Sequence, residues 1–325
     1  MNFLSNKILI WVIAGSVSLI LLLIILSQLD LNILAKTIDN ANINVLLLAI
    51  LFLLLEGIAT SYRILHLSSN TLEMKHAIYA NSWYALYVAF LPARLGEIAG
   101  IYVLKKHMQQ KQGAALGSII TQRLFDLIVL ATLFLIAIIF STDLLPKTIS
   151  ILSGITLIAI SATILMKCEK IFSLIAATSI KFKHPKTSRL TKLVFRTAIQ
   201  ARTWNKTQAI NIKIIIFSTT LKWIFNLTAI TCILISTNVS LNTDIIYIIS
   251  ALYNFIAVIP IQTIGGIGIG EAGLTLMLNG AGISLQESVA ISLYARAVIL
   301  IFPFLFLLIG TLNFHRLNLI KNING

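Results

Sequence analysis

Long apolar runs, each about as long as a bilayer is thick, recur along this chain. Six of them have close to the roughly 20 residues that a helix rising about 1.5 Å per residue needs to cross a hydrocarbon core. The pattern therefore predicts six full membrane-spanning helices. They lie at about 8–29, 43–65, 113–140, 148–167, 212–236 and 286–312.

Two further apolar segments are interrupted near their middle. Residues 77–104 are broken at Pro92–Glu97, within "LPARLGE", and residues 244–283 are broken within "IPIQTIGGIGIGE". The arm 77–91 would be only about 22 Å long as a helix, which is too short to cross the membrane. Each segment therefore either crosses once with a distortion or enters and leaves on the same side.

The distribution of lysine and arginine favours the second possibility. If both interrupted segments are re-entrant hairpins, most basic residues fall on one side, including a loop at 167–213 with eleven Lys or Arg and a single acid. Positive charge in short loops is biased towards the cytoplasm, so both termini are predicted to be cytoplasmic. The cytoplasmic set outside that loop is Lys7, Arg63, Lys75, Lys105, Lys106, Lys111, Arg316 and Lys321. The opposite side receives Lys36, Lys147, Asp30, Asp39, Asp143, Asp244 and Glu287.

The two interrupted segments also share a short sequence pattern. "RLGEIAG" and "GIGEAGL" each contain Gly-Glu followed by a step between small residues. Arg123 follows Glu97 by 26 residues, and Arg296 follows Glu271 by 25 residues. Each half of the chain is then predicted to contain helix, helix, broken hairpin and helix.

Because each half, about 1–140 and about 148–312, crosses three times, the second must be inverted relative to the first. Inverted repeats with broken helices are common in secondary transporters. The predicted fold is an all-α polytopic membrane protein with six full spans and two opposed re-entrant hairpins. It forms a single integral membrane domain over 1–325, with the cytoplasmic loop 167–213.

Composition supports the membrane class. The chain is 58% hydrophobic and 11% charged, with a mean hydropathy of +0.94, whereas soluble domains carry about 25% charged residues. The net charge of +14 could suggest nucleic acid. However, the basic residues lie between hydrophobic runs, where topology and anionic lipid head groups explain them equally well. Lys222, inside a span, is expected to extend its ammonium group to the cytoplasmic interface.

Seven charged residues fall at predicted membrane depth. At roughly 3 kcal/mol each on an insertion scale, they must face one another, a cavity or a ligand rather than lipid. They are Glu56, Arg94, Glu97, Arg123, Asp126, Glu271 and Arg296. The i, i+3 spacing of Arg123 with Asp126, and of Arg94 with Glu97, permits internal ion pairs. Purely structural pairing therefore remains open beside ligand binding.

The three arginines near the helix breaks are the favoured ligand-binding residues. A guanidinium group can pair two phosphate oxygens at once, and the amide ends of half-helices attract anions. Pro92 suits the first turn of a returning half-helix. Glycines at the breaks either turn N–H groups towards a ligand or allow close helix packing. The predicted head-group site comprises Arg94, Glu97, Arg123, Asp126, Glu271 and Arg296, with backbone from Pro92, Gly96, Gly266, Gly268 and Gly270.

Four motifs in order carry a resemblance to a known family. "LPARLGE", "GSIITQRLFD", "GGIGIGEAGL" and "YARAVILIFP" resemble the lysylphosphatidylglycerol synthase transmembrane family over nearly the whole chain. The resemblance implies a bacterial inner-membrane, multi-pass protein of the lipid flippase type. Some members carry a C-terminal aminoacyl-transferase domain. The chain stops at Gly325, so we expect that domain, and its enzyme activity, to be absent.

The expected function is movement of an anionic phospholipid or glycolipid between leaflets, with acids that position the arginines or receive a cationic head group. Membrane lipids are the expected partners, and no nucleic acid, cofactor, metal or catalytic residue is expected. A second hypothesis is a non-transporting lipid-binding partner of a glycolipid or lipid biosynthesis enzyme. The third is an integral-membrane glycosyltransferase, for which the Asp30–Asp39 loop is short and Asp-x-Asp is missing.

Overall fold

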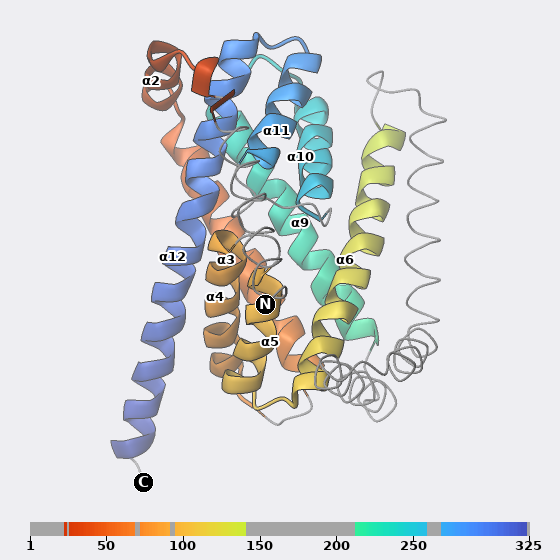
Figure 1. Ribbon diagram of the computed structural model, residues 1–325, viewed down its shortest axis with the longest axis vertical. Coiled ribbons are helices and arrows are strands. Elements are labelled where there is room, and N and C mark those ends of the chain that lie inside the picture. Colours follow the sequence, from red (N-terminus) through yellow and green to blue (C-terminus); the bar gives the residue numbers. More distant parts are fainter. Residues whose placement is uncertain are drawn as a thin grey trace, which may run out of the picture.

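The computed structural model describes an all-helical assembly. The described residues are 23–24, 26–68, 72–91, 95–140, 212–258 and 268–323. Side chains are described only to residue 136 in the segment 95–140 and to residue 314 in the segment 268–323. This part of the chain forms nine α-helices and no strand (Figure 1). They are α2 (Leu31–Asp39), α3 (Ile43–Leu67), α4 (Met74–Phe90), α5 (Leu95–His107), α6 (Gln112–Phe140), α9 (Ile212–Ser236), α10 (Thr243–Val258), α11 (Ile269–Gly280) and α12 (Leu285–Ile323).

Four of these helices are long and apolar enough to cross a membrane. The qualifying stretches are Ile43–Leu67, Gln112–Ile136, Ile212–Ser236 and Leu285–Phe314. They confirm four of the six predicted spans. The predicted span at 8–29 lies mostly outside the described residues, and the span at 148–167 lies wholly outside them.

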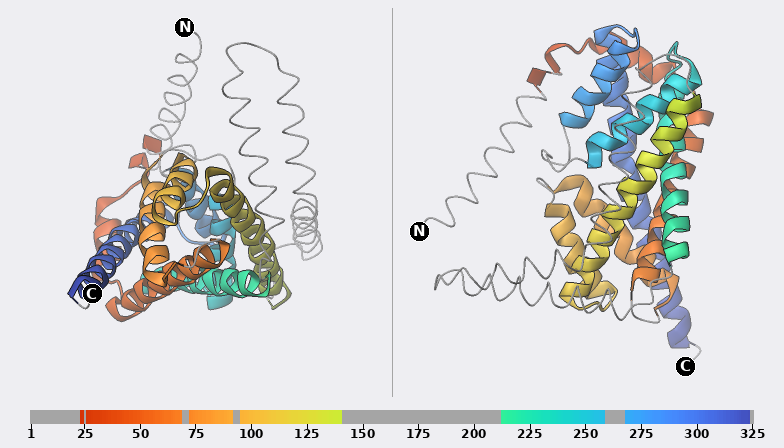
Figure 2. Two further views of the ribbon diagram at one scale, coloured as in Figure 1. Left: turned by 90° about the horizontal axis from the view of Figure 1, so that it is seen from below. Right: turned by 90° about the vertical axis from the view of Figure 1, so that its right-hand side faces the viewer.

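The helices α3 and α9 lie side by side and antiparallel along one face of the bundle (Figure 2). At one end, Asn42 N–H donates to the Ser236 carbonyl oxygen at 2.8 Å. Towards the other end, Arg63 Nη1 donates to Thr219 Oγ1 at 3.2 Å. Asn42 also caps α3, because its side-chain oxygen accepts from the N–H of Asn44 at 3.1 Å.

The long helix α12 packs against α3 and α4 through small residues. A Cβ atom added to Gly57 of α3 would lie 2.8 Å from the Phe306 ring of α12. Likewise, a Cβ on Gly310 of α12 would lie 2.6 Å from Ser82 Oγ of α4. Small residues at these crossings let helices approach closely, which is how helices associate in lipid.

The first interrupted segment forms α4 and α5, which pack antiparallel. A Cβ on Gly96 would lie 2.5 Å from the Val88 Cα atom, and one on Gly100 would lie 2.5 Å from the Tyr84 ring. Backbone atoms cannot yield as a flexible side chain can, so only glycine fits at Gly96. Of the two roles that the sequence left open for this glycine, the structure therefore gives it close helix packing.

The second interrupted segment forms α10 and α11. Gly268, which precedes α11, has a φ of 93°, a conformation that glycine adopts without steric penalty. A Cβ on Gly270 would lie 3.5 Å from the Tyr253 hydroxyl, an ordinary contact between α11 and α10. Pro92, Arg94 and Gly266 lie outside the described residues.

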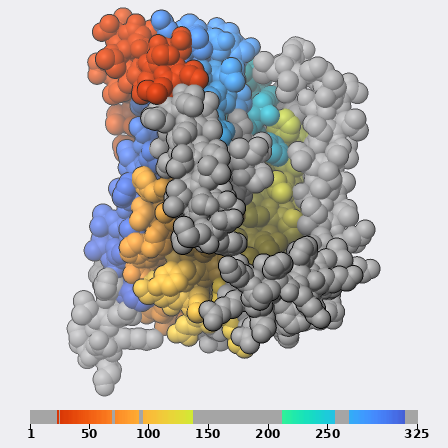
Figure 3. All heavy atoms as spheres, in the orientation of Figure 1, coloured from red at the N-terminus to blue at the C-terminus, as the bar shows by residue number. Residues whose placement is uncertain are grey.

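The two helix pairs occupy opposite ends of the molecule. In Figure 1, α4 and α5 lie in the lower half and α10 and α11 in the upper half, with the interrupted ends of both pairs directed towards the middle. The space-filling view places α2 and α11 at the upper end and the junction of α5 and α6 at the lower end (Figure 3). Asp30 caps α2 and Asp39 ends it, Asp244 lies in the first turn of α10, and Lys105 and Lys106 lie in the last turn of α5.

Candidate lipid head-group site

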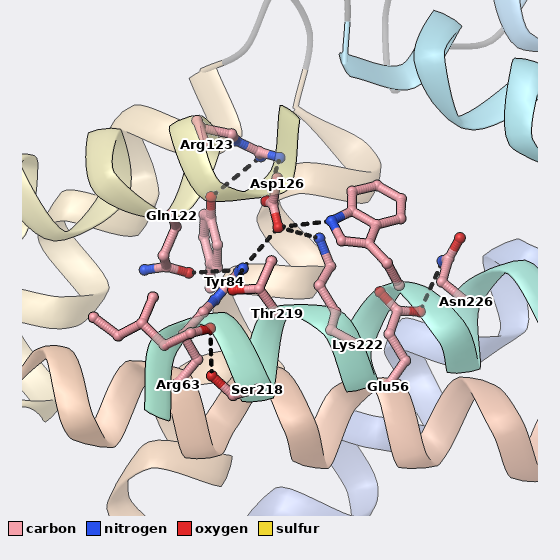
Figure 4. A network of polar contacts seen from close by, with 12 residues as sticks. Glu56, Arg63, Tyr84, Gln122, Arg123, Asp126, Ser218, Thr219, Lys222 and Asn226 are labelled. Atoms are coloured by element: carbon pink, nitrogen blue, oxygen red, sulfur yellow. Dashed lines mark hydrogen bonds and ion pairs between the residues drawn. The ribbon is translucent and has the colours of Figure 1, made fainter. Parts of the chain in front are cut away.

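A buried polar network centred on Asp126 joins α3, α6 and α9 (Figure 4). Asp126 Oδ1 accepts hydrogen bonds from Arg63 Nη1 at 2.7 Å, Lys222 Nζ at 3.1 Å and Trp223 Nε1 at 3.0 Å. The Asp126 side chain is only 2% exposed. One carboxylate therefore pairs with two buried cations contributed by two other helices.

Arg63 is a structural member of this network rather than a charge in a cytoplasmic loop. Its side chain is 2% exposed, and Nη2 donates to Gln122 Oε1 at 3.1 Å. From the sequence, Arg63 was counted on the cytoplasmic side of the membrane; the structure adds that its side chain is buried between helices rather than exposed. A position close to the C-terminal end of α3 looked interfacial, and its carboxylate partner lies 63 residues away along the chain.

Lys222 differs from the prediction. Its ammonium group binds Asp126 and lies 3.9 Å from the centroid of the Trp223 ring, and its side chain is 10% exposed. It therefore does not extend to the interface. The buried carboxylate offers a direct ion pair and the indole a cation–π contact, which together replace the hydration that the interface would have supplied.

Arg123 is the accessible member of the network. Nη1 lies 3.8 Å from Asp126 Oδ2, which confirms the i, i+3 contact predicted from the sequence. Nη2 lies 3.1 Å from Glu97 Oε1 and donates to the Tyr84 hydroxyl at 3.4 Å. The Arg123 side chain is 29% exposed and that of Glu97 is 22% exposed. Unlike Arg63, Arg123 can thus meet a group from outside the protein.

Glu97 forms an ion pair with Arg123 of the next helix. The predicted i, i+3 pair of Glu97 with Arg94 involves a residue outside the described part of the chain. Because Glu97 lies in the first turn of α5, its carboxylate also stabilises the positive end of that helix dipole.

The second half of the chain contains a matching pair. Arg296 Nε of α12 lies 3.2 Å from Glu271 Oε1, and the Tyr253 side chain of α10 lies near Arg296. Glu271 Oε2 accepts from the Gly268 N–H at 2.6 Å, so this carboxylate caps α11. The Glu271 side chain is 2% exposed and that of Arg296 is 16% exposed, so this pair is more enclosed than the first.

Both halves therefore build the same set of three residues. A tyrosine comes from the first helix of the interrupted segment, a glutamate from the first turn of the second, and an arginine from the following span. The sequence spacing indicated the glutamates and arginines, but the tyrosines were missed. Each tyrosine lies among apolar residues in the sequence, and a buried phenolic hydroxyl normally has a hydrogen-bond partner. This was the sequence feature that could have identified the two tyrosines as members of the site.

The expected anion-receiving end of one half-helix, α11, is already occupied. At α11, the Glu271 carboxylate takes the place that an external anion would take at the helix N-terminus. At α5, Glu97 lies in the first turn of the helix and forms an ion pair with Arg123. In the described structure, each of the two arginines is thus paired with a glutamate of the same chain.

One more charged residue lies beside the network. Glu56 of α3 accepts a hydrogen bond through Oε2 from Asn226 Nδ2 of α9 at 2.9 Å (Figure 4). Glu56 is half-buried. It was predicted to lie at membrane depth, and its place near the middle of the spanning helix α3 agrees with that prediction.

A family model described as the lysylphosphatidylglycerol synthase TM region matches residues 11–306. The chain belongs to this family. Every residue of the two arginine sites lies inside the matched region, and the four spanning helices agree with a polytopic membrane protein of the lysylphosphatidylglycerol synthase TM family. No curated protein and no solved structure matches the chain closely enough to add a relative.

Proposed function

We propose that this member of the lysylphosphatidylglycerol synthase TM family moves an anionic phospholipid or glycolipid between the leaflets of a bacterial inner membrane. The observation that carries the proposal is the accessibility of Arg123, a guanidinium group on a spanning helix that remains 29% exposed. Placing an arginine at that depth of the membrane costs free energy unless its guanidinium group lines a polar path or binds a ligand.

The contacts of Arg123 suit an exchange of anions. Asp126 approaches one side of the guanidinium group, while Glu97 and Tyr84 contact the other terminal nitrogen. A phosphodiester that displaced Glu97 would replace one negative charge with another and could use the same planar donors. The buried ion pairs of Asp126 with Arg63 and Lys222 would remain intact while the phosphodiester is bound.

The arrangement of the two helix pairs supports a transport cycle. Two antiparallel pairs that begin at opposite ends and break towards the middle are what re-entrant hairpins of an inverted repeat would produce. Arg296 with Glu271 and Tyr253 would then be the counterpart of Arg123 in the second half. In this cycle, the head group passes from one arginine to the other as each glutamate releases and recaptures its partner.

The proposed orientation places the lower end of Figure 1, with Lys105 and Lys106, in the cytoplasm. Single cysteines substituted for Lys106 and for Asp244, both exposed, are expected to react with a membrane-impermeant maleimide from opposite sides of the membrane. The Asp244 variant should label in intact cells, and the Lys106 variant only after permeabilisation. Labelling of both from the same side would refute the opposed hairpins.

Transport itself is testable in liposomes that contain only this protein. Fluorescent phosphatidylglycerol in the inner leaflet should become accessible to an external quencher with wild-type protein. With Arg123→Gln this accessibility is expected to fall at least about tenfold, because the exposed anion-binding group is lost. Lys36→Gln, at an exposed lysine, is the matched control. Retention of the lipid by wild type in native mass spectrometry, without leaflet exchange, would instead favour the non-transporting partner.

A further inference from the structure

Glu56 differs from the other charged residues beside Asp126. It lies near the middle of the spanning helix α3, and among the described residues no cation lies within ion-pair distance of its carboxyl group. Its hydrogen-bond partner is the neutral amide of Asn226. An ionised carboxylate at that depth is normally paired with a cation, whereas a protonated carboxyl group needs only a neutral partner.

The neighbouring amide can serve both protonation states of Glu56. Asn226 Nδ2 donates to the carboxyl group at 2.9 Å, while the buried Asn226 Oδ1 has no hydrogen-bond partner in the described part of the structure. A rotation of the amide that exchanges its oxygen and nitrogen would present Oδ1 to the hydroxyl of a protonated Glu56. The unpartnered oxygen is thus the acceptor that a neutral carboxyl group requires.

Among the described residues, the charges that surround Glu56 balance only when it is ionised. The group formed by this residue and the Asp126 network contains three cations, Arg63, Arg123 and Lys222, and three acids, Glu56, Glu97 and Asp126. Protonation of Glu56 leaves one excess positive charge. Arg123 is the most exposed of the three cations, at 29% against 2% for Arg63 and 10% for Lys222, so the excess charge can be compensated there by an external anion.

The polar and charged neighbours of Glu56 come from several helices. Lys222 and Asn226 belong to α9, Asp126 belongs to α6, and Arg63 belongs to α3 itself; the charges of Lys222, Asp126 and Arg63 interact electrostatically with Glu56. At the adjacent Gly57, α12 presents the Phe306 ring and α4 presents the Asn81 amide, which are both neutral.

We propose that Glu56 is a proton-binding site coupled to anion binding, such that one proton is taken up at Glu56 for each anionic head group bound at Arg123. The coupling rests on the proposed function, because it assumes that Arg123 binds the head group. By thermodynamic linkage, if protonation of Glu56 strengthens anion binding at Arg123, then anion binding strengthens protonation of Glu56 by the same factor. The anion affinity should therefore rise as the pH falls. Lipid movement would then draw on a proton gradient.

Isothermal titration calorimetry with the soluble lipid dihexanoyl-phosphatidylglycerol tests the coupling. In buffers of different ionisation enthalpy, the wild type should take up about one proton per anion, and its affinity should rise by up to about tenfold per pH unit on acidification. Glu56→Gln mimics the protonated state and should bind with the affinity of acidified wild type and without proton uptake. Glu56→Asp should restore uptake, and Asp39→Asn is the exposed-acid control.

Infrared spectroscopy tests the proton site independently of any lipid. The wild type should show a protonated-carboxyl band that titrates with pH and is missing from Glu56→Gln. If that band is present but wild type and Arg123→Gln bind the lipid equally weakly, the head-group assignment fails while the proton site stands. Identical infrared titrations of wild type and Glu56→Gln, or unchanged proton uptake in the variant, would overturn the proposal.

Discussion

Replacing Asp126 by alanine is expected to remove most of the folded protein from the membrane. The substitution leaves Arg63 and Lys222, both buried, without their shared carboxylate. Breaking a buried ion pair by removing one partner costs about 3–5 kcal/mol, because the remaining charge has neither water nor a counter-ion. That is a large part of the roughly 5–15 kcal/mol that stabilises a typical protein.

The loss can be measured as the fraction of protein that elutes as a single folded species after detergent extraction, and as its thermal unfolding temperature. Asp126→Asn is expected to lose less, because an amide oxygen can still accept from Trp223 Nε1. Adding Arg63→Gln to Asp126→Asn removes one uncompensated cation and should recover part of the stability, a coupling that a double-mutant cycle quantifies. An alanine variant as stable as the wild type would show that the network is dispensable.

Glu97→Gln and Arg123→Gln are expected to change anion binding in opposite directions. If Glu97 is the internal counter-ion that a phosphate must displace, removing its charge should strengthen binding of short-chain phosphatidylglycerol by about tenfold, or about 1.4 kcal/mol. Removing the guanidinium group should weaken binding by at least as much. Because both side chains are partly exposed, either variant should lose less stability than Asp126→Ala, whose partners are buried.

Native mass spectrometry of the two variants and the wild type, with the same lipid at fixed concentration, gives the comparison directly. Tyr84→Phe is a useful control, since it removes a neutral partner of Arg123 and leaves every charge in place. Weaker binding in both charge variants, together with a shared loss of stability, would show instead that the pair only holds α5 against α6.

Several features of the fold were predictable because they depend on local chain properties. Apolar length identified the spans that correspond to α3, α6, α9 and α12, since a helix must satisfy its own backbone in lipid. The separation of α4 from α5, and of α10 from α11, was predictable from proline and glycine, which disrupt helical hydrogen bonding or allow unusual backbone angles. The i, i+3 contact of Arg123 with Asp126 follows from the helical repeat.

The chemistry of the site depended on how distant helices pack. Arg63 and Lys222 looked like interfacial charges in the linear sequence, and only the packing of α3, α6 and α9 gives them a common carboxylate. Hydropathy assigns each residue an average preference for water or lipid, whereas the energy of a buried charge depends on partners from other helices within a few ångströms. Local sequence patterns thus predicted where the helices lie along the chain. Contacts between distant helices determined which of their charged side chains are buried in ion pairs and which are exposed enough to contact a ligand.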